Sequence, residues 1–147
     1  MEDYNIDYEG DNMWIEWSNK INILNKALDG YWLRNKTINQ NISNANTPNY
    51  KRLTVKFEDE LRDAMAIRKH RLSRTHRKHI PVSGAIDKVQ PRVEEKKHYS
   101  YRFDRNNVNI DTESADLAKN TIMYNALVNQ TIGEFEKIKN VINEVNK

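Results

Sequence analysis

Two long stretches of the chain repeat apolar residues at spacings that alternate between three and four. The first stretch runs through Trp14, Trp17, Ile21, Leu24, Leu28, Tyr31, Asn35, Ile38 and Ile42. The second runs through Leu117, Thr121, Tyr124, Val128, Thr131, Phe135, Ile138, Ile142 and Val145. An average spacing of about 3.5 residues is typical of helices that pair as coiled coils. The pattern therefore predicts two long terminal helices, each roughly 50 Å long at a rise of 1.5 Å per residue.

Polar residues predict where these helices begin. Asp11 or Ser18 suits the N-cap of the first helix, because a short polar side chain accepts hydrogen bonds from the unpaired N–H groups of a first turn. Asp111 suits the N-cap of the second helix, which we expect to run from about Thr112 almost to Lys147.

The sequence between the two stretches predicts a small mixed insert. Residues 53–72 favour a short helix with Thr54 as its N-cap, and the polar stretch 73–98 favours a loop with short strands. Tyr99, Tyr101 and Phe103 alternate with polar residues, which favours another short strand. A turn at 104–107 and an extended segment at 108–110 then lead into the second long helix.

The fold class that follows is mainly α. Two long terminal helices pack as a coiled-coil-like pair, and a short helix and a small irregular or β insert lie between them in the sequence. We expect an acidic flexible leader at 1–12, paired terminal helices at 13–51 and 104–147, and the insert at 52–103. In an isolated helix pair, much of each apolar seam remains exposed to water. These helices therefore need more packing partners than one chain supplies. Periodicity alone also fits an ordinary helical bundle or a homodimeric coiled coil.

The first long helix runs into a strong stop at residues 41–51, which read Asn-Ile-Ser-Asn-Ala-Asn-Thr-Pro-Asn-Tyr-Lys. Asn46 can take the left-handed conformation that closes a helix, and Pro48 cannot continue one. Pro48 and Asn49 suit the two central positions of a type II turn, whose second residue needs a positive φ. The stretch thus predicts a helix end followed by a tight turn.

The same stretch resembles the N-terminal signature of the bacterial flagellar axial proteins, Asn-Ile-Ala-Asn-Ala-Asn-Thr-Pro-Gly-Tyr-Lys. It departs from that signature at Ser43 and Asn49, and Asn49 keeps the turn chemistry. The positions that carry this half of the resemblance are Asn41, Asn44, Asn46, Thr47, Pro48, Asn49 and Tyr50.

The C-terminal half is similar to the segment that opens the C-terminal helix of flagellar basal-body rod proteins. Arg105 stands where the usual pattern has Gly, and Asn109 stands where it has Asp. The spacing of Phe135, Ile138 and Ile142 also matches the tail of these proteins. The positions that carry this half of the resemblance are Asn107, Val108, Asp111, Glu113 and Asn120.

The resemblance implies a structural subunit of the proximal rod, located in the flagellar basal body and exported through the type III apparatus without a cleaved signal peptide. Its terminal helices would build a helical tube with other rod subunits, in contact with basal-body and export-gate proteins and with the cell wall as a further contact. The residues expected to pack between subunits are Leu24, Leu28, Tyr31, Ile38, Ile42, Leu117, Tyr124, Val128, Phe135, Ile138 and Ile142.

Candidate chemistry is sparse. The chain has no cysteine, and its four histidines, His70, His76, His79 and His98, lack the neighbours that would complete a metal site. No nucleophile, phosphate-binding loop or carboxylate pair stands out, so we expect neither an enzyme nor a cofactor nor a small-molecule substrate. No segment has the pattern of a signal peptide or a membrane span.

A basic stretch is the main feature that favours a different function. Residues 68–79 hold six Lys or Arg and three His without an acid, whereas residues 1–16 hold six acids without Lys or Arg. Such a stretch can bind nucleic acid through phosphates, although it lacks interleaved aromatic residues. The alternative hypothesis is therefore a cytoplasmic basic coiled-coil adaptor or nucleic-acid-binding protein. A solvated or subunit-contacting patch is the favoured interpretation, with no nucleic acid expected.

Overall fold

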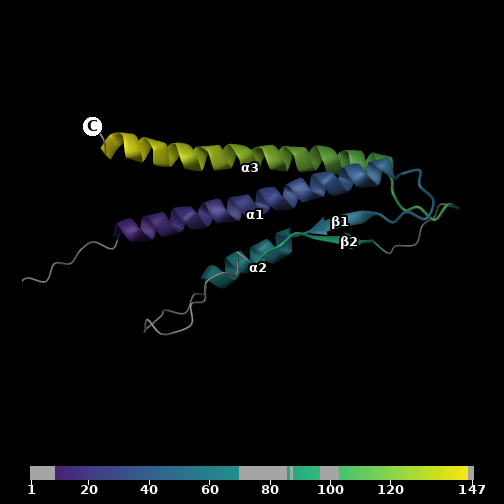
Figure 1. Ribbon diagram of the computed structural model, residues 1–147, viewed down its shortest axis with the longest axis horizontal. Coiled ribbons are helices and arrows are strands. Elements are labelled where there is room, and N and C mark those ends of the chain that lie inside the picture. The colour runs from purple at the N-terminus through teal and green to yellow at the C-terminus, as the bar shows by residue number, and fades with distance from the viewer. Residues whose placement is uncertain (1–8, 70–85, 87, 97–102, 146–147) are drawn as a thin grey trace, which may run out of the picture.

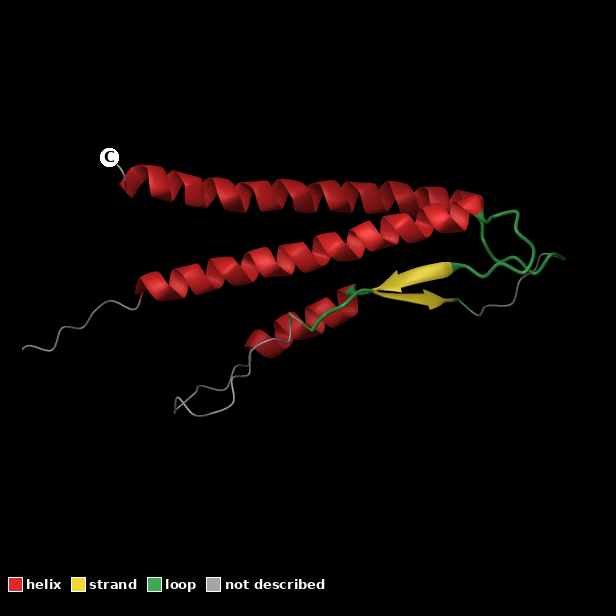
Figure 2. Ribbon diagram, viewed as in Figure 1, coloured by secondary structure: helices red, strands yellow, loops and turns green. Residues whose placement is uncertain are grey.

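The computed structural model describes residues 9–69, 86, 88–96 and 103–145. Helix α1 (Glu9–Ser43) is followed by strand β1 (Leu53–Lys56), helix α2 (Glu58–Lys69), strand β2 (Arg92–Glu95) and helix α3 (Ile110–Val145). The two long helices lie antiparallel and side by side, and the strands and α2 lie on the other side of α1 (Figures 1 and 2). The predicted mainly helical fold with two long terminal helices is confirmed.

Contacts join α1 and α3 along most of their length. The Trp17 indole Nε1 donates to the Glu134 carbonyl at 3.3 Å, and its ring meets Phe135 edge-on at 5.7 Å between centroids. Nearer the other end, the Asn120 amide donates to the Tyr31 carbonyl at 3.0 Å. Polar contacts between side chain and backbone therefore supplement the apolar seam, and they fix how far one helix is advanced along the other.

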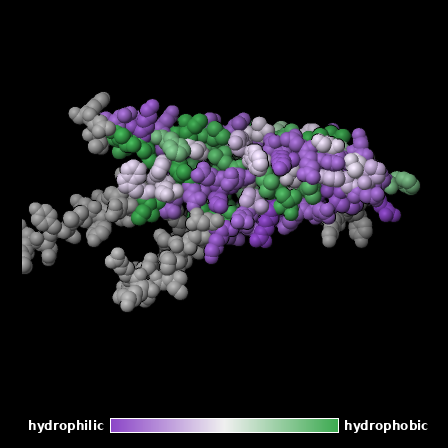
Figure 3. Space-filling view, in the orientation of Figure 1, coloured by the Kyte–Doolittle hydropathy of each residue, from purple (hydrophilic) through white to green (hydrophobic). Residues whose placement is uncertain are grey.

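The seam residues are mostly covered within the single chain, but not completely. Ile38 is buried, whereas Phe135 and Ile142 are about half exposed. The other residues expected to pack between subunits are partly buried: Leu24, Leu28, Tyr31, Ile42, Leu117, Tyr124, Val128 and Ile138. Figure 3 shows hydrophobic side chains at the surface among the hydrophilic ones along the helix pair. No helix in the described part of the chain is long and apolar enough to cross a membrane.

A third layer packs against α1. Strands β1 and β2 pair antiparallel, with Val55 opposite Val93. Beyond the strands, α2 packs on the middle of α1 and completes a small apolar core. This core consists of Ala27, Leu61, Ala64, Ile86 and Val89, with Ile23 and Leu127 packed against it. The insert is thus tied to both long helices through one shared cluster.

Gly30 allows the insert to approach α1 closely. A Cβ atom at this position would lie 2.5 Å from Cδ2 of Phe57, a distance that real side chains do not tolerate. Phe57 is buried, and its ring meets Tyr31 edge-on at 5.1 Å. The Arg34 guanidinium lies over the same Phe57 ring at 4.8 Å. Because Gly30 has no side chain, Phe57 can pack directly against α1. Phe57 is the largest buried apolar side chain of the described residues.

The helix starts differ from the predicted ones. Helix α1 begins at Glu9, so Asp11 and Ser18 lie inside the helix and neither caps it. Four residues of the predicted flexible leader, 9–12, are helical. Gly10, Asp11 and Asn12 are weak helix formers, so local propensity does not account for this earlier start.

The short helix also begins later than predicted. Residues 53–56 form β1, and α2 begins at Glu58, so Thr54 is not an N-cap. Leu53 and Val55 alternate with Thr54 and Lys56, which suits a strand, and pairing with β2 holds the segment in that conformation. The Phe57 carbonyl accepts the first helical bond, from Leu61 N at 2.8 Å.

Asn109, rather than Asp111, caps α3. Its Oδ1 accepts from Asp111 N at 2.9 Å and from Thr112 N at 3.3 Å, and Ile110 is already helical. Asp111 lies in the first turn, where its charge still suits the positive end of the helix dipole.

Several predictions concern residues outside the described ranges. These include the four histidines, most of the basic stretch 68–79, and Tyr99 and Tyr101 of the predicted strand. Phe103, the last residue of that predicted strand, lies in a turn.

Replacing Gly30 with Ala should destabilise the fold by about 1–2 kcal/mol. The new methyl group overpacks against Phe57, which costs about 1–3 kcal/mol, and the higher helix propensity of Ala offsets only part of this. Gly133→Ala is the matched control, because no atom lies within 4 Å of its new Cβ. We expect that change to stabilise α3 by about 0.5–1 kcal/mol. Urea unfolding followed by circular dichroism measures both, and equal effects would contradict the close approach.

Candidate assembly site at the helix junction

The residues of both family motifs meet where α1 ends and α3 begins. The loop that follows α1 and the segment that precedes α3 lie side by side at this end of the molecule (Figure 1). The Asn49 N–H donates to the Asp104 carbonyl at 2.8 Å, and Lys51 Nζ donates to the Arg105 carbonyl at 2.7 Å. We call this region, residues 41–52 with 103–116, the helix junction.

Asn41 is the centre of the junction. Its side chain is fully buried, at 0% exposure. Its amide Nδ2 donates to the Leu53 carbonyl at 2.8 Å and to Glu113 Oε2 at 2.9 Å. Its Oδ1 accepts from Leu53 N at 2.9 Å and from the Tyr50 hydroxyl at 3.1 Å. One side chain thus joins the end of α1, the start of β1 and the first turn of α3.

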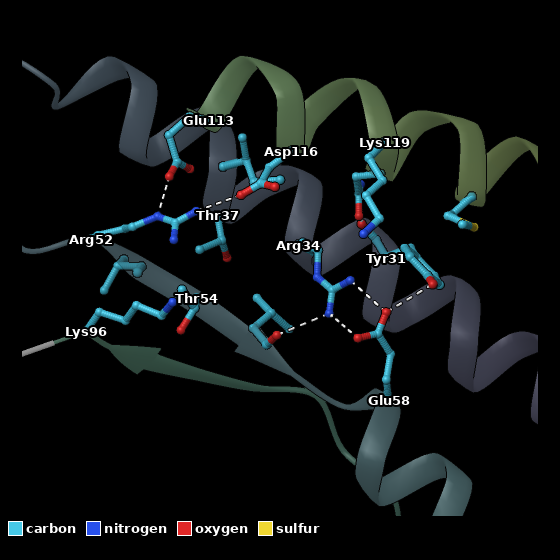
Figure 4. Close-up of a pocket in the computed structure, with 15 residues that line it drawn as sticks. Tyr31, Arg34, Thr37, Arg52, Thr54, Glu58, Lys96, Glu113, Asp116 and Lys119 are labelled. Atoms are coloured by element: carbon cyan, nitrogen blue, oxygen red, sulfur yellow. Dashed lines mark hydrogen bonds and ion pairs between the residues drawn. The ribbon is translucent and has the colours of Figure 1, made fainter. Parts of the chain in front are cut away.

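Glu113 carries a buried charge that Arg52 compensates. The carboxylate is also at 0% exposure, and Arg52 Nε pairs with its Oε1. Arg52 Nη2 pairs with Asp116 Oδ2 at 2.7 Å, so one guanidinium joins two turns of α3 (Figure 4). The Arg52 backbone N–H donates to Asn107 Oδ1 at 2.7 Å, and the Asn107 amide donates to the Lys96 carbonyl at 2.9 Å. The insert is therefore anchored to the same network.

Asn106 closes the outer part of the junction. Its Nδ2 donates to the carbonyls of Asn44 at 2.9 Å, Ala45 at 3.1 Å and Thr47 at 2.9 Å. Its Oδ1 accepts from Val108 N at 2.8 Å, and both Asn106 and Val108 are buried. A residue from the C-terminal half thus bonds three carbonyls of the loop that follows α1.

The predicted tight turn is present. The Tyr50 N–H donates to the Thr47 carbonyl at 3.3 Å, with Pro48 and Asn49 at the central positions. Asn49 has φ 61°, as the second central position of a type II turn requires. Asn46 does not take the predicted left-handed conformation. The helix instead ends at Ser43 through bonds from Asn44 N and Ala45 N to carbonyls of its last turn.

A cavity of about 470 Å³ lies beside the junction, between β1 and the two long helices (Figure 4). In it, Arg34 Nη1 and Nη2 donate to Glu58 at 2.8 and 3.0 Å, and the Tyr31 hydroxyl donates to the same carboxylate at 3.1 Å. The bonded Arg34 lowers the pKa of Glu58, and burial opposes this shift. Burial, and then the Glu58 hydrogen bond, raise the pKa of Tyr31. These pairs tie the start of α2 to the middle of α1.

The structure brings some motif residues together and leaves others apart. Tyr50 and Glu113 each bond the Asn41 side chain directly, and Asn107 joins them through Arg52. Val108 is buried in the junction. Asn44 holds the loop, donating to the Gln40 carbonyl at 2.8 Å and accepting from the Thr47 hydroxyl at 3.2 Å. The exposed motif residues, which shape the turn or begin α3, are Asn46, Thr47, Pro48, Asn49 and Asp111.

Asn120 lies apart from the junction, a little farther along α3. It is 2% exposed, and within the described residues its Oδ1 has no hydrogen-bond partner. Sequence reasoning missed Arg52 and Gly30, and it gave no role to Asn106. Arg52 follows the signature directly and Asn106 begins the Asn pair, so adjacency to the motifs was the signal that was available for both.

The junction uses its polar side chains to hold backbone and to pair charges. This arrangement defines a mainly helical protein in which the two terminal helices are joined into one unit at the helix junction. The chain resembles proteins named flagellar basal body rod protein FlgB. That of Bacillus subtilis (strain 168) is 33% identical over 126 residues, which cover 86% of this chain and 95% of that protein.

FlgB of Aquifex aeolicus (strain VF5) is 30% identical over 122 residues, 83% of this chain and 91% of that protein. FlgB of Borreliella burgdorferi is 31% identical over 134 residues, 86% of this chain and 98% of that protein. No family model matches the chain. The chain belongs to the FlgB family and is a structural subunit of the flagellar basal-body rod, not an enzyme. This membership excludes the adaptor or nucleic-acid-binding alternative as its primary function.

Replacing Asn41 with Ala should destabilise the fold by roughly 3 kcal/mol or more, because buried groups on three elements lose their partner. Asn39→Ala is the matched control on the same helix. Asn39 is exposed, and its amide donates to the Asn35 side chain on the same helix. We expect that control to change stability by less than about 0.5 kcal/mol. Chemical denaturation measures both, and similar losses would contradict the central role of Asn41.

Arg105 has φ 59°, and it stands where the flagellar pattern that this segment resembles has Gly. Arg105→Gly should therefore stabilise the chain by about 0.5–1 kcal/mol, because Gly reaches this conformation without a Cβ clash. Arg105→Ala removes the same side chain but keeps the Cβ, and it should give no such gain. A rise in melting temperature for both variants would show that the side chain, not the backbone, carries the strain.

Proposed function

We propose that the chain is a proximal-rod subunit that assembles with other flagellar rod components through its terminal helices into a helical tube. The observation that carries this proposal is a set of apolar side chains, on both terminal helices, that the single chain leaves exposed. On α1 and α3 they are Trp14, Ile15, Trp32, Ile110, Ile122, Met123, Ile132, Phe135, Val141 and Ile142. Exposed apolar surface on this scale is typical of an interaction surface.

The predicted subunit-packing residues divide into two groups under this proposal. Phe135 and Ile142 are half exposed and would contact neighbours directly. The partly buried seam residues would hold α1 against α3, and neighbouring subunits would cover what remains of their surface. Complete burial of an exposed apolar side chain contributes about 1.5–3 kcal/mol, and a half-exposed side chain contributes correspondingly less, so the lattice would depend on many such contacts together.

Head-to-tail contacts between non-equivalent surfaces build open helical assemblies rather than closed rings when the rotation does not close. The antiparallel helix pair suits such contacts, because the junction lies at one end of the molecule and the free helix ends lie at the other (Figure 1). The basic stretch 68–79 would meet acidic neighbours or the anionic cell wall, and export would proceed through the flagellar type III apparatus, in contact with export-gate proteins.

Ile122→Asp should abolish rod assembly while leaving the free subunit folded. Ile122 is 67% exposed, so the new carboxylate remains in water in the single chain. In an assembled rod, the same carboxylate would be buried against apolar surface without a partner, which costs several kcal/mol. We expect cells that carry only this variant to be non-motile and to lack rods in electron micrographs of basal bodies.

Ile122→Val is the matched control, because it keeps an apolar β-branched side chain, and it should swim normally. Circular dichroism of both purified variants should match that of the parent chain. Normal motility of the Asp variant would contradict the assembly role of this face of α3.

A further inference from the structure

The cavity of about 470 Å³ beside the helix junction carries more positive charge than its own carboxylates use. From the described residues, its walls hold four positive and three negative side chains, namely Arg34, Arg52, Lys96, Lys119, Glu58, Glu113 and Asp116. Both oxygens of Glu58 accept from Arg34, and Arg52 pairs with Glu113 and Asp116. Each of the three carboxylates is therefore already paired with an arginine.

The two lysines are the charges that remain in this lining. In the described part of the chain, no ion pair involves Lys96 or Lys119. Both residues are exposed, and Figure 4 shows their side chains reaching toward the cavity, Lys96 from the end of β2 and Lys119 from α3. The hydrogen-bonded Arg34 lowers the pKa of Glu58 most, and the more distant Lys119 adds a smaller effect. The exposed part of the lining thus offers two ammonium groups that no carboxylate bonds.

Asn120 adds an unsatisfied acceptor to the lining of the same cavity. Its side chain is almost fully buried, and its Nδ2 donates to the Tyr31 carbonyl at 3.0 Å. Its Oδ1 is also buried, and no group in the described ranges donates to it. A buried acceptor without a donor is unfavourable, so a bound group that carries an N–H stabilises this position. The cavity therefore lacks both an anion for its lysines and a donor for Asn120.

We propose that this cavity binds an acidic peptide segment of another rod component. An Asp or Glu side chain of that segment pairs with Lys96 and Lys119, and a backbone N–H of the same segment donates to Asn120 Oδ1. A carboxylate alone accepts hydrogen bonds and donates none, whereas an acidic residue in a peptide carries both groups. The cavity volume also lies within the range of about 300–1,000 Å³ that is typical of ligand sites and exceeds what one ion fills.

The inference rests on the proposed function and deepens it, because it assigns a chemistry to one contact with a neighbouring rod component. The site lies where α1, α3 and β1 meet, so it exists only in the folded chain (Figure 4). Charged contacts at an interface distinguish between partners more than they add affinity, since a partner with the wrong charge leaves the lysines unpaired. The exposed apolar side chains would then hold neighbours together, and the cavity would help to select which neighbour binds.

Titration of the purified full-length chain with the capped tripeptide acetyl-Glu-Glu-Glu-amide, followed by NMR, tests the site. The side-chain amide signal of Asn120 should shift and saturate, while that of Asn129, which is exposed on the same helix, should not. Two matched probes separate the parts of the proposal. Acetyl-Gln-Gln-Gln-amide lacks the charge, and glutarate keeps two carboxylates but has no N–H. Each should bind roughly tenfold more weakly, the effect of losing one good hydrogen bond.

Substitutions in the chain test the same contact from the other side. Lys96→Gln and Lys119→Gln, combined in one chain, should weaken binding of the Glu tripeptide roughly tenfold or more, because two charge-assisted hydrogen bonds are lost. Lys139→Gln is the matched control, since Lys139 is exposed on α3 and does not line the cavity, and it should bind like the parent chain. Added salt should weaken binding to the parent chain more than binding to the double variant.

Any of four results would overturn the inference. The first is the absence of a saturating shift at Asn120, and the second is equal affinity of the double lysine variant or of the Gln tripeptide. The third is equal affinity for glutarate, which would make this a site for free dicarboxylates. The fourth is a shift of the Asn120 signal with the concentration of the chain alone, which would place a second copy in the cavity. Rod assembly is tested separately by the motility of Ile122→Asp cells, so failure of tripeptide binding would leave the proposed rod function standing.

Discussion

The buried amide of Asn41 is the interaction on which the rest of the structure depends. An Asn side chain offers two donor hydrogens and two acceptor sites, and here all of them are used by Leu53, Tyr50 and Glu113. Two apolar seams with a regular repeat pack almost equally well after a shift by one repeat, because apolar contacts are not directional. A saturated amide tolerates no such shift, so the junction sets the register that the seams leave open.

Polar and apolar side chains thus have different roles at the two ends of the helix pair. Polar side chains at the junction specify one arrangement, with the Glu113 charge buried only because Arg52 compensates it. Toward the free helix ends, apolar and aromatic side chains take over, and several remain exposed, such as Trp14 and Val141. This arrangement suits a subunit of an extended assembly. Polar contacts fix its fold at one end, and exposed apolar side chains remain available for neighbouring subunits at the other.

Much of the fold could be predicted because long helices leave a strong periodic signal. The apolar repeats predicted both long helices, and Pro48 with Asn49 predicted the turn, because these elements depend on local sequence. The strand at Leu53–Lys56 was missed because it exists through pairing with β2, nearly forty residues away, which no local pattern reveals. Similarly, the role of Gly30 depends on Phe57 in another layer, and Asn106 acts through carbonyls of the distant loop. Long-range partners, rather than weak local signals, set the limit of the prediction.

Two of the four departures from the flagellar signatures, Asn49 and Arg105, fall on the two facing segments of the junction. Asn49 and Arg105 both have positive φ, and Gly is the residue that takes this conformation without strain. A non-Gly residue there costs about 1 kcal/mol, less for Asn, so the backbone shape is kept although the residues best suited to it are not. Hydrogen bonds from Asn49 N to Asp104 and from Lys51 to Arg105 hold both positions. Backbone hydrogen bonds, rather than the residue types at these two positions, therefore maintain the geometry of the junction.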